Sequence, residues 1–162
     1  MSTPARIARR LAGFARPRVD ITDPPSGVVV DWDVPIAVRD GTILRANVFR
    51  PAGGEPAPVV MCAHPYGKDA LPRRRLGRYQ PARQYRIFHQ PDPIAFSAWT
   101  GWEAPDPAFW VPQGFAVVNL DLRGFGTSEG TGELLSAQQG DDEHDAIEWV
   151  AAQPWCTGRV GL

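Results

Sequence analysis

Two short apolar runs, each followed at once by polar and glycine residues, constrain the fold of this 162-residue chain more than any other feature. The first is PVVMCAHP at 58–65, and the second lies at 116–121 within GFAVVNLDLRGFG. A continuous apolar run of this length is typical of a strand that is covered on both faces. We therefore expect these two segments to lie inside a buried, parallel β-sheet.

The segments on either side of these runs extend the pattern. Residues 28–51 contain two β-rich runs around an Asp-Gly pair at 40–41, which predicts a β-hairpin. Residues 140–155 predict a helix with acidic side chains in its first turn, where the helix dipole favours them. Residues 159–162 read as the opening of another buried strand. This order favours an α/β fold with a mixed, mostly parallel sheet.

Charge divides the chain near residue 27. Residues 1–18 carry five arginines and no acid, whereas the other 144 residues carry 12 basic and 18 acidic side chains. We therefore separate a basic N-terminal arm, 1–27, from a domain at 28–162. Ile7, Leu11 and Phe14 are spaced for one helical face, which predicts a loosely packed basic helix, with a transit peptide or a membrane-surface helix as the alternative.

Bulk properties exclude several classes of protein. A net charge of −1 gives no general attraction to nucleic acid or membranes. No apolar run is long enough to span a bilayer, and no secretory signal is recognisable, so we expect a cytoplasmic protein. Cys62 and Cys156 suit free, buried thiols in a reducing compartment, with a disulfide as the alternative. No Cys/His spacing indicates zinc, and no cofactor is expected.

The long stretch 67–112 shows no clear period and is rich in proline and aromatic residues. An irregular segment of this length inside a domain is often functional. Its most plausible helix lies at 105–111. The run 73–75, three arginines, predicts a solvated loop, with contact to an acidic partner as the alternative; His89 is expected to be structural.

The residues His64-Pro65-Tyr66-Gly67-Lys68 directly follow the first apolar run. Folds with parallel sheets place their ligands at the carboxyl ends of the strands. The hydroxyl of Tyr66 can therefore donate a hydrogen bond to a developing oxyanion. The alternative is a structural tyrosine that closes the strand.

The second run leads into RGFGTSEG at 123–130. The glycine spacing there does not fit a phosphate loop and no lysine is present, so a glycine-bent connection is the better interpretation. We expect Asp121 and Arg123 to pair locally and hold it. Ser128 stands between Thr127 and Glu129, outside any G-x-S-x-G setting, and is not expected to be a nucleophile.

Acidic side chains gather at 141–148. His144 and Glu148 share a helical face, which makes a metal site the alternative to a solvated acidic helix. A second histidine at ligand spacing is missing, so we expect no metal.

Four blocks of the sequence together resemble one known family. They are VPIAVRDGTILRANVFRP, PVVMCAHPYGKD, GFAVVNLDLRGFGTSEG and DDEHDAIEWVAAQPWCTGRVGL, in this order. They resemble the N-terminal part of the X-Pro dipeptidyl-peptidase and cocaine-esterase-like family of α/β-hydrolases, over residues 34–162 with a variable loop at 71–109. The resemblance implies the N-terminal part of an α/β-hydrolase fold and a serine hydrolase that cleaves ester or X-Pro amide bonds by acyl transfer.

In that family, the strand after W-C-x-G-x-V-G leads into a G-x-S-Y-x-G elbow that carries the nucleophilic serine, and an aspartate and a histidine follow later. None of these parts occurs in the 162 residues. We therefore expect an N-terminal fragment, truncated before the nucleophile elbow and inactive alone. The alternatives are a non-catalytic remnant, or half of a split enzyme that associates with a complementing C-terminal segment.

The resemblance also implies roles for individual residues. Tyr66 matches the tyrosine whose hydroxyl forms half of the oxyanion hole. The loop 71–109 would lie over the pocket for a small ester or peptide substrate, with Trp99, Trp102 and Trp110 as candidate contacts. Because the strand missing from the middle of the sheet would leave 59–63 unpaired, we expect an apolar, aggregation-prone edge there.

Overall fold

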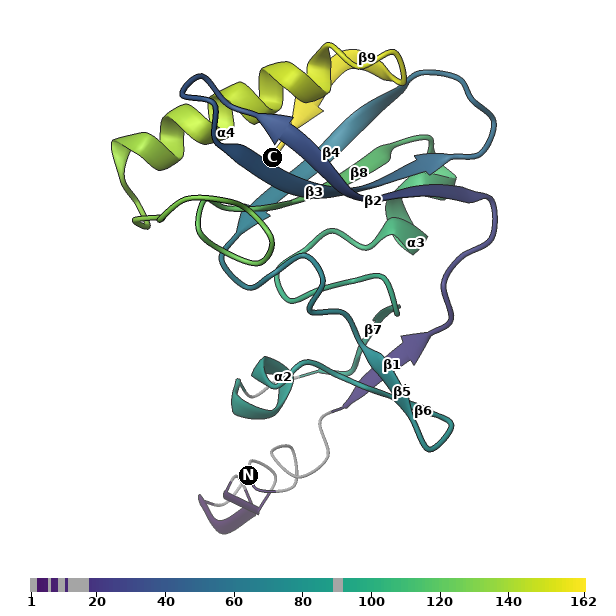
Figure 1. Cartoon of the computed structure of the whole chain (residues 1–162). Helices are drawn as coiled ribbons and strands as arrows, with labels where there is room; N and C mark the ends of the chain where they lie inside the picture. The colour runs from purple at the N-terminus through teal and green to yellow at the C-terminus, as the bar shows by residue number, and fades with distance from the viewer. Residues whose placement is uncertain (1–2, 6, 9–10, 12–17, 89–91) are drawn as a thin grey trace.

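The two apolar runs form neighbouring parallel strands inside a five-stranded sheet in a computed structural model of this chain (Figure 1). The structure describes residues 3–5, 7–8, 11, 18–88 and 92–162. The strand order is β2 (Val28–Ala37), β3 (Ile43–Pro51), β8 (Ala116–Asp121), β4 (Ala57–His64) and β9 (Cys156–Gly161).

The sheet is mixed, as the sequence predicted. The hairpin β2–β3 is antiparallel and β3 pairs antiparallel with β8, whereas β8, β4 and β9 run parallel. A connection between parallel strands needs a crossover, and α4 (Ala137–Ala151) supplies it from β8 to β9, which lies on the other side of β4. The carboxyl ends of three strands therefore meet at one edge of the sheet, which is where α/β folds place their ligands.

The core lies between the sheet and α4, which covers one of its faces (Figure 1). Leu44, Met61 and Leu120 are buried on the sheet side, and Ala146 and Val150 are buried on the helix side. Burial of each large aliphatic side chain stabilises the fold by about 1.5–3 kcal/mol. The opposite face carries a smaller cluster around Phe49, Val111 and Val117.

Helix α4 begins earlier than predicted, at Ala137 instead of residue 140. Ser136 is the N-cap, and its side chain accepts a hydrogen bond from the Gln139 backbone N–H at 3.2 Å. The first turn therefore contains no acidic residue, and the prediction that the acids crowd that turn was wrong. The acids lie further along, where Asp141 and Asp145 bind Arg39 of the β2–β3 hairpin.

The prediction of an unpaired edge at 59–63 was wrong for its first two residues. Strand β4 lies between β8 and β9, and β9 is the edge strand. Val160 stands opposite Val59 and Gly161 opposite Val60, where β9 ends. Residues 61–63 lie beyond this pairing, and the prediction that this edge promotes aggregation stays a prediction.

The segment between β4 and β8 holds more regular structure than its sequence suggested. It contains β5 (Arg73–Arg75), β6 (Arg78–Gln80), α2 (Gln84–Ile87), β7 (Ile94–Ser97), α3 (Pro107–Trp110) and the 3₁₀ turn η1 (Val111–Gln113). The helix predicted at 105–111 is thus confirmed as α3. β7 pairs in parallel with β1 (Val19–Thr22), and β5 pairs with β6.

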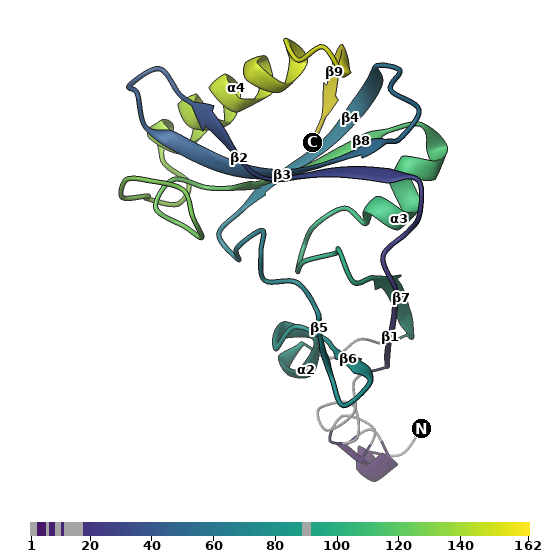
Figure 2. The same cartoon turned by 45° about the vertical axis from the view of Figure 1, so that its right-hand side comes forward.

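These small elements form a lobe below the sheet, which is clearest in Figure 2. We call residues 18–24 and 71–97 the basic lobe, because they contain seven arginines and three aspartates. Of the three apolar residues predicted to share a helical face in the N-terminal arm, Ile7 and Leu11 are exposed, while Phe14 lies outside the described residues. His89 likewise lies outside them. The division of the chain at residue 27 stays a prediction.

Two further expectations concern chemistry and membranes. Cys62 and Cys156 are both free, as predicted, and burial raises the pKa of the Cys62 thiol to about 12. A protonated, partly buried thiol is a poor nucleophile. Within the part of the chain that the structure describes, none of the helices is long and apolar enough to cross a membrane.

Candidate functional site

Tyr66 lies on the turn that follows β4, at the carboxyl edge of the parallel strands. Pro65 precedes it and Gly67 follows it with a φ of 85°, a left-handed conformation that glycine adopts without steric cost. The side chain of Tyr66 is 41% exposed, and its ring lies 5.8 Å from that of His64. The phenol therefore stands on a tight turn with part of its surface open to a ligand.

Asp121, the last residue of β8, holds this turn in place. Its carboxylate accepts a hydrogen bond from the Lys68 backbone N–H at 2.6 Å and another from the Thr127 N–H at 3.1 Å. The Asp121 side chain is completely buried. A buried carboxylate needs such partners, because an unpaired charge in the interior is strongly unfavourable. Asp121 thus connects the turn after β4 with the turn after β8.

Lys68 adds a second anchor. Its side chain is completely buried, and its ammonium lies 2.6 Å from Asp69, 2.8 Å from Asp33 and 3.8 Å from Asp121. Burial by itself would lower the pKa of Lys68, but hydrogen bonds to Asp33 and Asp69 raise the pKa above its ordinary value. Lys68 is therefore a fixed cation beneath the Tyr66 turn, surrounded by three carboxylates.

Asp33 reaches this cluster from a bulge in β2. It has a φ of 54° and lies where the register between β2 and β3 shifts. Its N–H donates to Asn47 at 3.0 Å, and Thr127 donates to its carboxylate at 2.6 Å. Hydrogen bonds from Lys68, then Thr127, lower the pKa of Asp33. Because of the bulge, the Asp33 carboxylate of the hairpin reaches Lys68 in the Tyr66 turn.

The glycine turn after β8 is a structural connection, as predicted, but its contacts differ from the expected ones. Arg123 does not pair with Asp121: its guanidinium binds Asp142 at 2.7 Å and Asp40 at 3.0 Å. A Cβ at Gly126 would collide with the Asp121 carboxylate, so the turn can pass only at a glycine. The predicted local pair was wrong because Asp121 binds the Lys68 and Thr127 N–H groups, whereas Arg123 binds carboxylates of the hairpin turn and of α4.

Ser128 has a structural role in this turn. Its hydroxyl donates to the Asp121 backbone carbonyl at 2.7 Å and accepts from the Arg45 N–H at 2.9 Å. A serine held by two backbone bonds, without a basic partner, is not activated as a nucleophile.

His64 is buried beneath Tyr66. Burial lowers the pKa of its imidazole, so the ring is neutral at pH 7. Neither ring nitrogen has a hydrogen-bond partner among the described residues. His64 therefore packs against the Tyr66 ring and has no carboxylate hydrogen-bonded to it, unlike the base of a catalytic triad.

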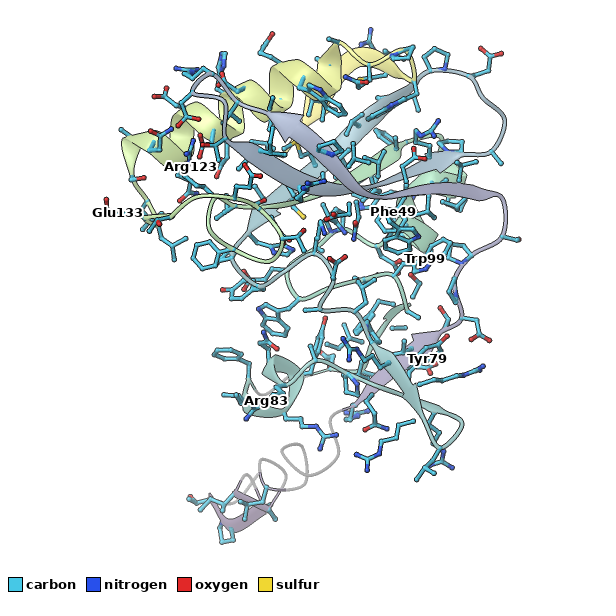
Figure 3. The ribbon with its side chains drawn as sticks, viewed as in Figure 1. Phe49, Tyr79, Arg83, Trp99, Arg123 and Glu133 are labelled. Carbon is cyan, nitrogen blue, oxygen red and sulfur yellow. The ribbon has the colours of Figure 1, made fainter. Side chains whose placement is uncertain are left out.

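The three tryptophans predicted to contact substrate do not all lie together. Trp99 packs on Trp32 and Phe49, with ring centroids 6.3 Å and 5.6 Å apart. Trp110 contacts Phe109 and Phe115, and Trp102 contacts Tyr85 and Phe88 in the basic lobe. Figure 3 shows Trp99 beside Phe49 under the sheet. Trp99 and Trp110 share one apolar cluster, whereas Trp102 lies elsewhere, so their common role stays a prediction.

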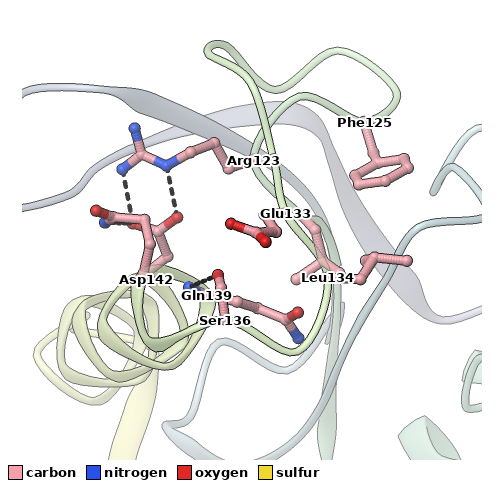
Figure 4. A pocket seen from close by; sticks show the side chains of 10 residues that line it. Arg123, Phe125, Glu133, Leu134, Ser136, Gln139 and Asp142 are labelled. Carbon is pink, nitrogen blue, oxygen red and sulfur yellow. Dashed lines mark hydrogen bonds and ion pairs between the residues drawn. The ribbon is translucent and has the colours of Figure 1, made fainter.

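A small cavity lies between the glycine turn and the start of α4 (Figure 4). It is lined by Phe125, Glu133 and Ser136 among others, and the Arg123–Asp142 pair closes one side. Its volume of about 10 Å³ has room for about one water molecule, so it is no substrate site. His144 is exposed beside Asp145, and no metal-binding group of three His, Cys, Asp or Glu side chains occurs among the described residues.

Tyr66 stays a prediction as a site residue, and sequence reasoning did not predict the polar cluster around its turn. The cluster consists of Asp33, Asn47, Lys68, Asp69 and the buried carboxylate of Asp121. A lysine in a loop normally indicates a solvated side chain. The one available signal was the position of Lys68 and Asp69 directly after the tyrosine, at the end of a buried strand.

The geometry can be compared with known proteins. Residues 40–162 match the family described as X-Pro dipeptidyl-peptidase (S15 family). The chain belongs to this family. The match includes Tyr66, Lys68 and Asp121.

Similarity to individual proteins supports the same family. Cocaine esterase from Rhodococcus sp. (strain MB1 Bresler) is 29% identical over 130 residues, which are 80% of this chain and 18% of that protein. A CocE/NonD family hydrolase from Staphylococcus aureus is 35% identical, with a TM-score of 0.69 over 83% of this chain and 22% of that chain. A second structure of that hydrolase is 30% identical, with a TM-score of 0.71 over 91% of this chain and 28% of that chain. The chain therefore spans about a fifth to a quarter of these relatives' length, and it corresponds to the N-terminal part of their α/β-hydrolase fold.

Proposed function

We propose that this chain supplies the oxyanion-hole side of a serine hydrolase that cleaves ester or X-Pro amide bonds. The observation that carries the proposal is Tyr66, whose phenol is partly exposed on a turn that Asp121 and Lys68 hold in place. A preorganised donor costs no reorganisation when charge develops on the substrate oxygen, which is the requirement for an oxyanion hole.

The position of β9 supports the same proposal. β9 is parallel to β4, and Gly161 stands opposite Val60, four residues before His64. At about 3.3 Å per residue, a segment continuing β9 reaches the level of Tyr66 within about five residues. In the family that this sequence resembles, the serine elbow follows this strand. A serine there would stand next to the Tyr66 turn.

In the proposed reaction the serine Oγ forms a bond to the carbonyl carbon of the substrate, and a histidine takes its proton. Tyr66 and the N–H after the serine donate to the oxyanion. The leaving alcohol or amine takes the proton from the histidine, and water then releases the acid from the acyl-enzyme. The serine, aspartate and histidine are proposed to come from a segment outside these 162 residues, which alone would be inactive.

A chimera tests the proposal. Residues 1–162 are joined to the part of the Staphylococcus aureus hydrolase that follows its matching segment, and kcat is measured on p-nitrophenyl esters and X-Pro p-nitroanilides. Tyr66→Phe is expected to lower kcat about 100- to 1,000-fold while a fluorophosphonate still labels the serine. Tyr79→Phe, whose hydroxyl binds Asp23 in the basic lobe, is the matched control and should leave kcat unchanged.

Two outcomes contradict the proposal. One is a Tyr66→Phe chimera that keeps kcat within about twofold, because removal of an oxyanion donor costs far more. The other is ester hydrolysis by the 162-residue chain alone, which would require a nucleophile among the present residues.

A second candidate is a non-catalytic protein, or half of a split enzyme, that acts through association. The observation that favours it is the outer edge of β9, where Thr157, Gly158 and Arg159 are exposed. Co-expression of the chain with a separate segment that carries the elbow, aspartate and histidine distinguishes the two. Recovered esterase activity would identify a split enzyme, and a stable complex without activity would identify a binding module.

A further inference from the structure

Charge is strongly segregated between the basic lobe and the rest of the chain. The lobe has seven arginines and three aspartates, and the arm at 1–17 that leads into it adds four arginines and no acid. The remaining residues, 25–70 and 98–162, carry six basic and fifteen acidic side chains. A nearly neutral protein is therefore positive at one end and negative at the other, and its positive end favours an anionic partner.

The β5–β6 hairpin concentrates this charge on one face. Arg74 pairs with Tyr79 across the hairpin, with its guanidinium 5.2 Å above the ring, and both side chains bind Asp23 next to β1. Because side chains alternate along a strand, Arg73, Arg75 and Arg78 point to the opposite, outer face. Figure 3 shows Tyr79 at this hairpin in the basic lobe.

The outer face lacks compensating charges. Arg73, Arg75 and Arg78 are exposed and have no ion-pair or hydrogen-bond partner among the described residues. Arg75 and Arg78 stand directly opposite each other in the register. Like charges at such a position destabilise a hairpin, and a bound anion would remove that cost.

An apolar tip stands in the middle of these arginines. Leu76 is 97% exposed at the hairpin turn, with a φ of 50°, followed by Gly77 with a φ of 76°. Turns with two left-handed residues normally carry Asn or Gly at the first position. A shallow surface hollow is lined by Arg75, Leu76, Arg78 and Gln80 together, so the leucine and the two arginines share one surface.

We propose that the outer face of the β5–β6 hairpin docks onto an anionic lipid surface. Arg73, Arg75 and Arg78 would bind lipid phosphates, and Leu76 would enter the boundary between headgroups and acyl chains. An exposed leucine among unpaired arginines favours a lipid surface over a nucleic acid, because only the bilayer offers apolar depth next to its phosphates. The docking would hold the protein at the surface with the acidic domain turned away from it.

Vesicle co-sedimentation of the 162-residue chain tests this proposal without any enzymatic activity. Vesicles of phosphatidylcholine with about a third phosphatidylglycerol are compared with pure phosphatidylcholine. Binding is expected only to the anionic vesicles, and it should weaken from roughly 0.05 to 0.5 M salt, because screening shortens the reach of exposed charges. The triple variant Arg73→Gln/Arg75→Gln/Arg78→Gln should bind on the order of 100-fold more weakly, about fivefold per arginine.

Leu76→Asn separates lipid insertion from simple charge attraction. Asparagine tolerates the left-handed conformation, so this variant should fold at least as well as the wild type. Its binding is expected to fall about tenfold. Leu135→Asn is the matched control: Leu135 is also 97% exposed with a φ of 60°, but it lies in the acidic part of the chain. It should leave binding unchanged.

Three results would overturn the proposal. Equal binding to neutral and anionic vesicles would exclude a role for the arginines. Binding that needs the arginines but not Leu76 would indicate a plain polyanion contact. A concentration-dependent increase in mass without vesicles, lost in the triple variant, would show that the basic lobe binds the acidic half of a second copy instead.

Discussion

Lys68 and Arg78 lie ten residues apart, and the fold gives them opposite environments. The Lys68 ammonium is buried among three carboxylates beneath the Tyr66 turn, whereas Arg78 is exposed and faces Arg75 across a hairpin. At the sheet edge, charges pair within the chain and fix a loop. On the outer face of the β5–β6 hairpin, Arg75 and Arg78 have no ion-pair partner among the described residues. The fixed Lys68 thus suits preorganisation of a loop, whereas the exposed arginines suit the recognition that we propose.

Substitution of Lys68 and of Arg78 tests this comparison most directly. Lys68→Met is expected to lower the free energy of unfolding by about 3–5 kcal/mol, because it leaves the buried Asp121 without its counter-ion. Arg78→Met, the control, is expected to change it by less than about 0.5 kcal/mol. Urea unfolding of the 162-residue chain, followed by circular dichroism, measures both. Equal losses in the two variants would show that the Lys68 cluster contributes no more than a surface charge.

Two glycines allow a second test of the difference between the sheet edge and the basic lobe. Gly126 and Gly77 both have positive φ values, 54° and 76°, but a Cβ at Gly126 meets the Asp121 carboxylate and one at Gly77 meets nothing within 4 Å. Gly77→Ala should therefore cost only the backbone strain, about 1 kcal/mol. Gly126→Ala adds the collision and should cost about 3 kcal/mol. Thermal unfolding of both variants measures the difference, and similar midpoints would mean that Asp121 moves aside easily.

The smallest expected effect concerns the ion pair between Asp40, which is 45% exposed, and Arg123, which links the hairpin turn to the glycine turn after β8. A hydrogen bond from Arg123, then one from the Thr42 backbone, lowers the pKa of Asp40 from 3.8 to about 2. Because the pKa is lower in the folded protein, the pair contributes its full stabilisation above about pH 4 and loses it as the pH falls through 2. Asp40→Asn should therefore reduce the loss of stability between pH 4 and 2. Parallel curves of unfolding free energy against pH for variant and wild type would contradict this.

Much of the sheet could be predicted because its residues carry local signals. The apolar runs in β4 and β8, the Asp-Gly turn of the hairpin and the acidic helix each have a period or a turn residue that physical chemistry explains. The helix start was missed because Ser136 caps the helix five residues before the acidic run begins at Asp141. The sequence analysis did not predict that β9 pairs with β4, because this pairing depends on how far β9 extends, which no local pattern encodes.

The candidate site divides in the same way. Tyr66 could be proposed from the sequence because it directly follows a buried strand and matches a family motif. Asp33 could not, since its part in the site depends on a bulge that aligns β2 with residues 35 and 88 positions away, Lys68 and Asp121. The partners of Arg123 were predicted wrongly for the same reason: Asp40 and Asp142 come from distant elements, whereas Asp121 is merely adjacent in sequence.

The sequence by itself determined the family and the order of strands and helix, because these depend on short-range periodicity and on motifs. Only the tertiary structure decided which charges are neutralised. Lys68 and Arg78 look alike along the chain, and only packing buries the first among carboxylates and leaves the second on an open face. The physical reason is that electrostatic energy depends on distance through space and on exposure to water, and neither is a local property of the sequence.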